Sequence, residues 1–441
     1  MSSPLNSKLS RRNFMRMLGV GAASAALPAW LPRVAAQATV NTDLAGDIVI
    51  WDRAGDLFQV IDAAIPAFNA LYPNIRVDHQ AVETSRLAPT LVAGVNVPDG
   101  AFIEDESLGL IQQHLLDITD WMAPHVDNLI SYKVRVGTFD GQIKAIPYDV
   151  DPAMLFYRSD ILESNGIDVA SILTYDDLIG AAVNLKTANS NMKPIHIDTT
   201  PALIVLWVSM LANQQNASFI DANGELTLES EPFLNIMNFI KNALDQGVGN
   251  LSGFASTDDI AACDQGIQCF YPWAIWFNYQ VDALLKDSRG LWRATNLPRW
   301  TEGGAQTASM GGSSFIIPSG AANPELSWAF YEYMMLSLDG IRAAFGPNDI
   351  YPGGITTIIP AYKPSYAEQL MVPPESLGGQ DLYGFATSLV DQIPQDYYFP
   401  LWFGQLGDIL GANVQRMQAG DLTPEDVLSI SAEEIRSNLM R

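Results

Sequence analysis

The chain has 441 residues, of which 24 are lysine or arginine and 49 are aspartate or glutamate, so its formal net charge is −25. Nucleic acid and anionic lipid repel a protein of this charge, so binding to either is disfavoured. The length provides for two lobes with separate hydrophobic cores.

The first forty residues have the pattern of an export signal. A basic stretch at 10–16 contains an arginine pair followed by Phe14, and an apolar run extends from Met17 to Leu31 before small residues close the segment. A basic stretch, a short apolar core and an A-x-A-like end are typical of a signal peptide. The arginine pair favours the twin-arginine type. We therefore expect residues 1–38 to be a twin-arginine signal and the protein to work in the periplasm or elsewhere outside the cytoplasm.

Two fates are open for this segment. Cleavage is expected after Ala36 or Ala38, and removal of its five basic residues takes the net charge to about −30. The alternative is an uncleaved segment that tethers the protein to the membrane, although the apolar run is short for a spanning helix. No later stretch is long and apolar enough to span a bilayer.

Cysteine and histidine usage predicts neither a metal site nor a bound cofactor. In an oxidising compartment, Cys263 and Cys269 could close a small disulfide loop. The twin-arginine route exports folded proteins, however, so the sequence leaves this bond open. The four histidines are scattered, and no C-x-x-C or H-E-x-x-H motif accompanies them.

The first part of the mature chain alternates short strands with helices. Apolar runs predict strands at 47–51, 75–78 and 101–103, and helical spacing of apolar residues predicts helices at 57–71 and 87–93. Strand, helix, strand, helix and strand joined by short links favour a parallel sheet with right-handed crossovers. The fold class expected from this order is α/β.

The remaining chain continues this mixture. We expect a hairpin turn at 139–141, a strand at 141–147 after it, and an irregular segment rich in aromatic residues and proline at 373–403. Further strands are expected at 154–157 and 315–318, and further helices at 160–165, 176–184, 203–211, 231–245 and 323–336. The helices at 231–245 and 323–336 lie far apart in the sequence, so the two lobes are expected to interleave along the chain.

Several short motifs follow one another in a fixed order. Residues 68–77 (FNALYPNIRV) and 97–100 (VPDG) precede the sharpest run, at 140–168, which contains DGQIKAIPY, LFYRSDIL and NGID. The sequence TYDDL follows at 174–178. Together these motifs resemble the extracellular solute-binding proteins of ABC importers, specifically the sugar-binding group that includes maltose-binding proteins. The resemblance covers nearly all of residues 45–435.

The resemblance implies the two-lobe periplasmic-binding-protein fold of type II, with hinge strands and a ligand cleft between the lobes. Lobe 1 is expected to hold 45–152 plus 311–350, and lobe 2 to hold 153–310 plus 351–435. The chain is expected to cross from one lobe to the other near Asp151 and at Gly311–Gly312; these two segments are called the crossings. The implied function is non-catalytic: a monomer binds a mono- or oligosaccharide and delivers it to an ABC permease in the membrane.

Sugars need carboxylates or amides for their hydroxyls and flat aromatic rings for their C–H faces. Glu104, Asp105 and Glu106 follow the third strand, and open α/β sheets bind ligands at the carboxyl ends of strands. The strand period places Glu104 and Glu106 on one side, so one of them is the expected contact. The alternative is a solvated acidic loop.

Other contacts are implied by the resemblance. Asp151 stands where the family has an acidic sugar contact, and its alternative role is to cap a turn in the hinge. Asp52 and Arg53 stand in the loop after the first strand, where the family has polar contacts. Arg53 could instead pair only with the neighbouring Asp56.

The aromatic candidates are tryptophans and one tyrosine. By resemblance, Trp273 stacks on a sugar ring, and its position beside a proline predicts a loop rather than the core. Trp276 is a possible second platform, and Trp207 lies on an apolar helix, where a core position is favoured. Tyr398 and Trp402 fall where another aromatic residue of the family lines the cleft.

The rival class is an exported glycoside hydrolase, because acids and aromatic residues also build such sites. It needs two carboxylates at a fixed separation, one with a raised pKa. The chain has no G-x-S-x-G elbow and no phosphate loop, and residues 311–314 precede a predicted strand rather than joining a strand to a helix. A binding module for a chemoreceptor or sensor has the same fold and stays open.

Overall fold

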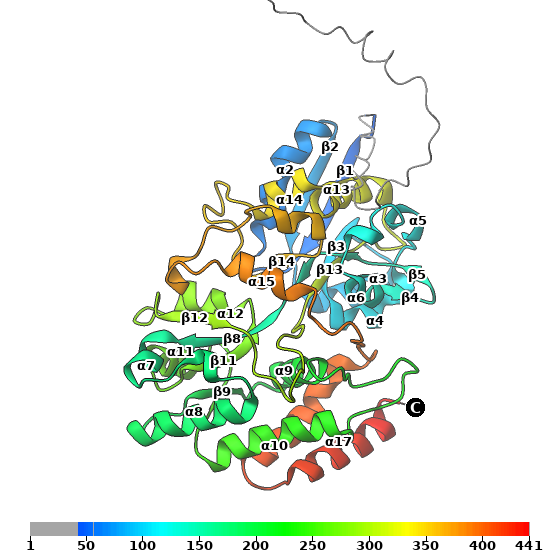
Figure 1. The fold of residues 1–441 in the computed structure, drawn as a ribbon. Helices are drawn as coiled ribbons and strands as arrows, with labels where there is room; N and C mark the ends of the chain where they lie inside the picture. Colours follow the sequence, from blue (N-terminus) through cyan, green and yellow to red (C-terminus); the bar gives the residue numbers. More distant parts are fainter. Residues whose placement is uncertain (1–42, 56, 441) are drawn as a thin grey trace, which may run out of the picture. The chain divides into compact units, whose positions relative to one another are not determined.

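Two five-stranded β-sheets organise the chain in a computed structural model, which describes residues 43–55 and 57–440 (Figure 1). The predicted signal at 1–38 lies outside these residues. The first sheet has the strand order β2 (Ile75–Ala81), β1 (Gly46–Asp52), β3 (Gly100–Glu104), β13 (Ser313–Ile316) and β6 (Ile146–Pro147). The second has the order β10 (Gly249–Ser252), β9 (Ile195–Asp198), β11 (Phe270–Ala274), β8 (Ala153–Arg158) and β12 (Trp292–Thr295).

The first sheet has the predicted parallel arrangement. Strand β1 pairs in parallel with β2 and with β3, and the connections contain α2 (Gln59–Leu71) and α3 (Leu87–Ala93). These five elements confirm the expected order of strands and helices. Strand β13 comes from much later in the chain and runs antiparallel to β3 and β6. The sheet is therefore completed by a segment that returns from the second sheet.

The second sheet is also mixed. Strands β10, β9 and β11 are parallel, whereas β8 is antiparallel to β11 and β12. Short crossings connect the two sheets. One passes through β7 (Asp149–Val150), which pairs with β14 (Ile359–Pro360), and a bridge joins Pro152 to Ser309. The other crossing leads through 307–312 into β13.

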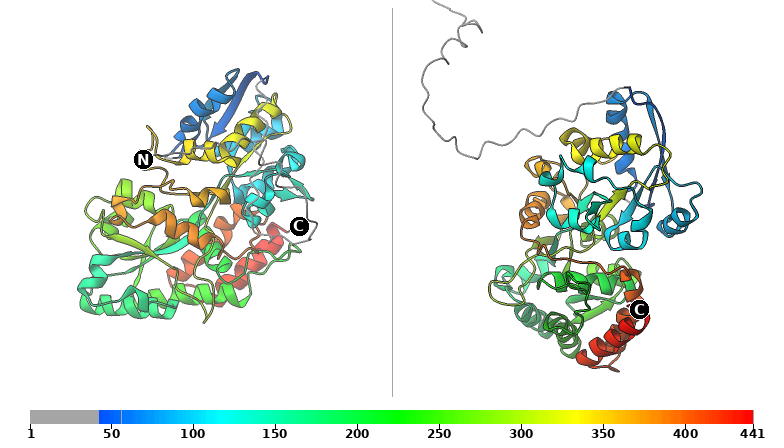
Figure 2. Two further views of the ribbon diagram at one scale, coloured as in Figure 1. Left: turned by 45° about the horizontal axis from the view of Figure 1, so that its top comes forward. Right: turned by 90° about the vertical axis from the view of Figure 1, so that its right-hand side faces the viewer.

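Helices cover these sheets, and segments far apart in sequence pack together. Helix α10 lies beside α17, and α2 lies beside α14 (Figures 1 and 2). The remaining helices are α4 (Leu108–Ile111), α5 (Thr119–Met122), α6 (Ser131–Val136), α7 (Ser159–Ser164), α8 (Tyr175–Ala188), α9 (Pro201–Asn213), α10 (Glu231–Asp245), α11 (Thr257–Asp264), α12 (Phe277–Tyr279), α13 (Pro324–Leu336), α14 (Leu338–Phe345), α15 (Leu382–Val390), α16 (Ala412–Gln418) and α17 (Pro424–Asn438).

Local sequence explains where several helices begin. Thr174 and Asp177 form a capping box at α8, in which each side chain accepts a hydrogen bond from the backbone N–H of the other residue. Helices α9, α10, α13 and α17 have proline in the first turn, where its missing N–H costs no helical hydrogen bond. None of the described helices is long and apolar enough to cross a membrane.

Two predictions about elements were wrong. The strand expected at 141–147 is divided into β5 (Gln142–Ile143), which forms a hairpin with β4 (Thr138–Phe139), and β6, which joins the first sheet. The positive φ values of Asp140 and Gly141, 51° and 78°, give the predicted turn a type I′ form, which fixes this short hairpin.

The segment 373–403, expected to be irregular, contains α15. This helix begins where the Asp381 side chain accepts a hydrogen bond from the backbone N–H of Gly384. Its sequence, LYGFATSLV, contains glycine and β-branched residues with low helix propensity, so packing rather than propensity determines it.

Candidate functional site

Polar side chains follow the carboxyl ends of β1 and β3 in the first sheet. Asp52 ends β1 and is buried, and its Oδ1 accepts a hydrogen bond from the backbone N–H of Arg53 at 2.7 Å. Burial raises the pKa of Asp52, although the nearby His79 opposes that effect. The Arg53 guanidinium lies 5.0 Å from the centroid of the Phe102 ring, and its Nη1 is 4.0 Å from Glu104 Oε1. The structure therefore brings Asp52, Arg53 and Glu104 to one edge of the sheet.

A buried ion pair lies beneath this edge. Lys133 of α6 is fully buried and donates to the Asp105 carboxylate and, at 3.0 Å, to the carbonyl oxygen of Ser313. The hydroxyl of Ser314 donates to Asp105 Oδ1 at 2.7 Å, and Asp149 Oδ1 accepts from the backbone N–H of Ser313 at 2.5 Å. Burial raises the pKa of Asp149 to about 6, although Lys133 opposes that shift. This cluster ties β3, α6 and both crossings together.

Two carboxylates near this cluster have unpartnered oxygens. Glu106 Oε2 and Asp151 Oδ1 are buried and have no hydrogen-bond partner among the described residues. Burial, together with the charge of Glu104, raises the pKa of Glu106 to about 8. Burial and the charge of Asp149 also raise the pKa of Asp151 well above its usual value. A buried polar oxygen without a hydrogen-bond partner is unfavourable, so both carboxyl groups are suited to form hydrogen bonds with hydroxyl groups of a ligand.

The second crossing consists of two glycines where it passes these carboxylates. Gly311 and Gly312 have φ values of +91° and +112°, which an L side chain rarely adopts. A Cβ on Gly311 would lie 3.3 Å from Asp151 Oδ2, and one on Gly312 would lie 2.8 Å from Lys133 Nζ. Glycine is therefore required for the close approach of this backbone to the acidic cluster.

Trp273 lies in β11 and not in the predicted loop. The strand runs on through Pro272, which pairs with Leu155. The Trp273 side chain is 0% exposed, and its Nε1 has no hydrogen-bond partner among the described residues. Four rings pack around it at centroid distances of 5.0 to 5.5 Å: Phe254, Trp276, His196 and Tyr271. No face of Trp273 is therefore open to a ligand in this structure.

Trp276 is partly exposed, in contrast to Trp273. Its Nε1 donates to the carbonyl oxygen of Met310 at 3.2 Å, and the same nitrogen is 4.0 Å from the place of a Cβ on Gly311. Through Gly311, this ring is brought close to Asp151. Trp276 and Asp151 are thus neighbours at the second crossing.

The other predicted aromatic residues are not gathered at this place. Trp207 is 0% exposed in α9, and its Nε1 donates to the carbonyl oxygen of Pro272 at 2.9 Å. The partly exposed Tyr398 packs against the Arg135 guanidinium, whose Cζ is 5.1 Å from the ring centroid. Trp402 is also partly exposed. Within the described ranges, no ring contact joins Tyr398 or Trp402 to Trp273 or Trp276.

Sequence reasoning missed Lys133 and Phe254. Lys133 stands in the run SYKVRV with no recognisable motif around it, and only its burial against Asp105 distinguishes it. Phe254 follows β10, whose short and partly polar sequence, GNLS, gave no strand signal. Had that strand been recognised, the position of Phe254 after its carboxyl end would have pointed to the site.

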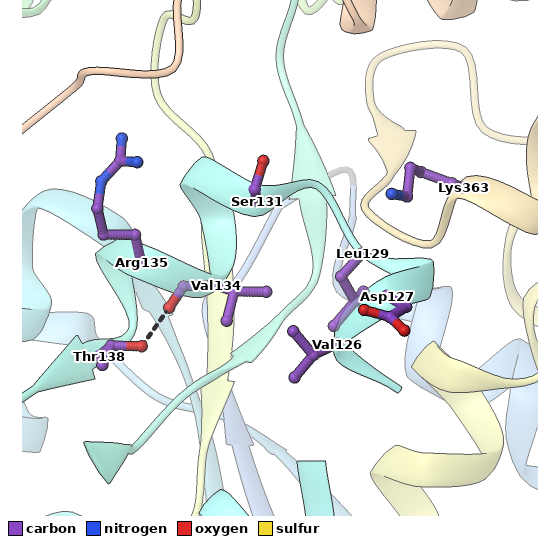
Figure 3. A pocket seen from close by; sticks show the side chains of 8 residues that line it. All are labelled: Val126, Asp127, Leu129, Ser131, Val134, Arg135, Thr138 and Lys363. Carbon is purple, nitrogen blue, oxygen red and sulfur yellow. Dashed lines mark hydrogen bonds between the residues drawn. The ribbon is translucent and has the colours of Figure 1, made fainter. Parts of the chain in front are cut away.

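A hollow lies elsewhere, along α6 (Figure 3). Its volume is about 440 Å³. Arg135 and Lys363 contribute the basic side chains, and the Thr138 hydroxyl donates to the carbonyl oxygen of Val134 at 2.7 Å. None of the predicted site residues lines this hollow. A smaller hollow is lined by Asp52 and Arg53.

The sequence left open whether Cys263 and Cys269 form a disulfide. Cys263 and Cys269 are both buried and both free, so no disulfide joins them. Burial raises the pKa of each thiol. Neither belongs to a cluster suited to a metal ion, and no such cluster of three or more His, Cys, Asp or Glu side chains occurs within 43–55 and 57–440.

Comparison with known sequences identifies relatives. The chain matches the family model described as bacterial extracellular solute-binding protein over residues 54–336, more than half of its length. It is 24% identical to an arabinooligosaccharide-binding protein of Halalkalibacterium halodurans, over 68% of this chain and 69% of that protein. It is 25% identical to a lactose-binding protein of Rhizobium radiobacter, over 88% of this chain and 92% of that protein.

Solved structures agree in fold. The sugar-binding protein MalE of Xanthomonas citri matches with a TM-score of 0.73 at 17% identity, over 89% of this chain and 97% of that chain. A transporter-associated binding protein of B. animalis subsp. lactis, solved with β-1,6-galactobiose, matches with a TM-score of 0.70 at 19% identity and the same coverage. These likenesses confirm the predicted two-lobe α/β fold.

Proposed function

Because the chain belongs to the bacterial extracellular solute-binding proteins, we propose that it binds a mono- or oligosaccharide and delivers this ligand to an ABC permease. The ligands of its relatives and structural neighbours, arabinooligosaccharide, lactose and β-1,6-galactobiose, support this ligand class. The observation that carries the proposal is the pair of buried, unpartnered oxygens on Glu106 and Asp151. Sugar hydroxyls both donate and accept hydrogen bonds, so they can pair with these carboxyl groups in either protonation state.

Family membership tests two of the predictions, the class of protein and its location. Its members are solute-binding proteins, so the prediction of a binding protein rather than a glycoside hydrolase is confirmed. They are also extracellular, so the protein works outside the cytoplasm. The twin-arginine route of export, the cleavage of residues 1–38 and the alternative of a membrane tether belong to the proposal.

The lobe boundaries belong to the proposal as well. We assign 45–152 plus 311–350 to lobe 1, and 153–310 plus 351–435 to lobe 2. The composition of the sheets supports this assignment, because each five-stranded sheet draws all its strands from one of these two sets. The pair β7 and β14 then lies at the hinge.

Within the site, the roles follow from exposure and charge. Glu106 and Asp151 accept ligand hydroxyls, with Glu104, Asp52 and Arg53 at the same edge. Trp276 offers a partly exposed ring, whereas the fully buried Trp273 and Trp207 support that wall from behind. Gly311 and Gly312 let the hinge backbone approach the ligand, and Tyr398 and Trp402 are further candidate contacts.

Calorimetry of the purified protein against arabinooligosaccharides, lactose, galactobiose and maltose tests the proposal. We expect at least one ligand to bind with a Kd in the micromolar range or tighter, about −8 kcal/mol or better. The combined Glu106→Gln and Asp151→Asn variant should bind this ligand at least about tenfold more weakly. If no saccharide binds, or if the protein turns a glycoside over, the proposal is wrong.

A further inference from the structure

The second sheet has a carboxyl edge comparable to that of the first. Strands β10, β9 and β11 are parallel, so their carboxyl ends meet at one edge. Asp198 ends β9, Phe254 follows β10 by two residues, and Trp276 follows β11 by two residues. Because ligands of α/β lobes bind at such an edge, Phe254 belongs to the same neighbourhood as the proposed platform Trp276.

The Phe254 ring covers the buried tryptophan. It lies parallel to Trp273, with a centroid distance of 5.4 Å and an interplanar angle of 0°, and perpendicular to Trp276 at 4.9 Å. Phe254 is partly exposed, whereas Trp273 is fully buried. Phe254 and Trp276 are thus the accessible rings of this cluster, and Trp276 connects Phe254 to the crossing at Gly311.

The backbone that carries Phe254 is strained and held in place. Ala255 has a φ of +56°, an uncommon value for a residue with a Cβ that occurs mainly where surrounding structure enforces it. The backbone N–H of Phe254 donates to Asp198 Oδ2 at 2.7 Å, and that of Ala255 donates to Asp259 Oδ2 at 3.1 Å. Gln280 Oε1 also accepts from Ala255 N–H at 3.1 Å. Two carboxylates therefore fix the turn.

Both carboxylates are fully buried, and His196 lies between them. His196 Nδ1 is 3.3 Å from Asp259 Oδ1, and its Nε2 is 3.6 Å from Asp198 Oδ2. The Tyr271 ring stacks on the imidazole at 3.9 Å, and its hydroxyl donates to Asp259 Oδ2 at 3.1 Å. Cys263 is a further titratable group near Asp259. A buried charge cluster of this kind is costly, and here it lies directly behind a strained turn that presents one aromatic ring.

We propose that Phe254 is a ligand-contacting residue that determines specificity, and that the buried cluster of His196, Asp198 and Asp259 positions it. Its ring forms the wall of the second lobe against which a sugar ring packs. Such a ring shields the apolar C–H face of a sugar from water. This inference rests on the proposed saccharide function.

Calorimetry with the saccharide that the parent protein binds most tightly tests the role of Phe254. Phe254→Ala should weaken binding about tenfold or more, as expected for an aromatic anchor, whereas Phe254→Trp should stay within about threefold because it keeps a flat ring. Phe385→Ala is the matched control: this phenylalanine of α15 is also partly exposed, and among the described residues no ring contact joins it to Phe254, Trp273 or Trp276. The Phe385→Ala variant should bind the saccharide with the affinity of the parent.

A double-mutant cycle tests the positioning role. Asp198→Asn should weaken binding several-fold in the parent but cause no further loss in Phe254→Ala, because the carboxylate acts through that ring. Additive losses would overturn the positioning role. If the parent binds a saccharide and Phe254→Ala binds it equally well, this inference alone fails. If the parent binds no saccharide, the proposed function fails and the inference fails with it.

Discussion

The carboxyl group of Glu106 makes the stability of the protein depend on pH. Burial raises the pKa of Glu106 from 4.5 to about 8. Between these values the folded protein holds a proton that the unfolded chain has lost, so stability falls as pH rises. The contribution of this group is fully present below about pH 4.5 and is lost as the pH passes about 8. We expect Glu106→Gln to be more stable than the parent at pH 9, by about 1–3 kcal/mol, and similar to it at pH 5.

Urea unfolding at the two pH values measures this difference. Glu302→Gln is the control, because Glu302 is exposed and its substitution should change the free energy of unfolding equally at both values. A Glu106→Gln variant that is no more stable than the parent at pH 9 would show that burial does not raise the pKa of Glu106.

We expect Trp273 to contribute more to the stability of the fold than a ligand contact in a cleft would. Its side chain is 0% exposed and packs among four rings. Trp273→Ala should therefore lower the free energy of unfolding by about 3–5 kcal/mol, as the loss of a buried tryptophan does. Trp276→Ala should cost less, because Trp276 is partly exposed. Urea unfolding compares them. A stable Trp273→Ala variant that fails to bind saccharide would instead place that ring in the ligand cleft.

Individual residues were predictable where the chain itself sets their position. Glu106 and Asp151 each follow a short strand, as predicted, and Asp151 lies beside the crossing at Gly311. Their role as ligand contacts stays a prediction. Trp273 was expected in a loop because proline usually interrupts strands, but β11 continues through Pro272. Phe254 was not predicted at all, because its neighbours lie on or just after β9 and β11, which are separate from it in the sequence, and no local pattern indicates such a cluster.

At the scale of elements, periodicity predicted the first sheet better than the second, of whose strands only β8 was expected. The strands and helices of the first sheet up to β3 agree with the sequence to within a few residues. Helix α10 has the predicted bounds, Glu231–Asp245, because its apolar residues recur at helical spacing. Strands β6 and β10 were not predicted as they occur, since each is short and depends on pairing with distant segments.

The second crossing depends on glycine at position 312. An alanine there would bring its Cβ to 2.8 Å from Lys133 Nζ and 3.0 Å from Asp105 Oδ2, at a φ of +112°. Gly312→Ala should therefore lower the free energy of unfolding by at least about 2 kcal/mol and weaken ligand binding. Gly303→Ala is the matched control, because its φ of +76° is also positive but nothing lies within 4 Å of its Cβ.

Thermal melting and calorimetry together measure this effect. The Gly303→Ala variant should lose only about 1–2 kcal/mol through its backbone conformation and keep the parent affinity. Equal losses of stability and affinity in the two variants would mean that the contact with Lys133 and Asp105 imposes no constraint on the crossing.

For the whole molecule, the sequence predicted that the segments of the two lobes interleave along the chain. It did not show which residues hold the returning segment in place. Strand β13 completes the first sheet after the chain has built the second. The acidic cluster holds this return in place, since Asp105, Lys133 and Asp149 all contact β13 or the glycines before it. The groups proposed to bind ligand are therefore supported by the same residues that join the two sheets.

The free cysteines of this fold are compatible with export in the folded state. Cys263 and Cys269 are buried and free, so folding requires no disulfide and no oxidising compartment.

The arginine pair at 11–12 lies outside the described residues, and its sequence context favours the twin-arginine route. Changing Arg11 and Arg12 together to lysine should leave folded precursor in the cytoplasm, because that route reads the arginines themselves and not their charge. Fractionation of cells detects the precursor by its size, and saccharide binding by the cytoplasmic fraction shows that it is folded. Changing Arg33 to lysine is the control and should leave export normal. If the double variant is exported as well as the parent, the protein uses another route.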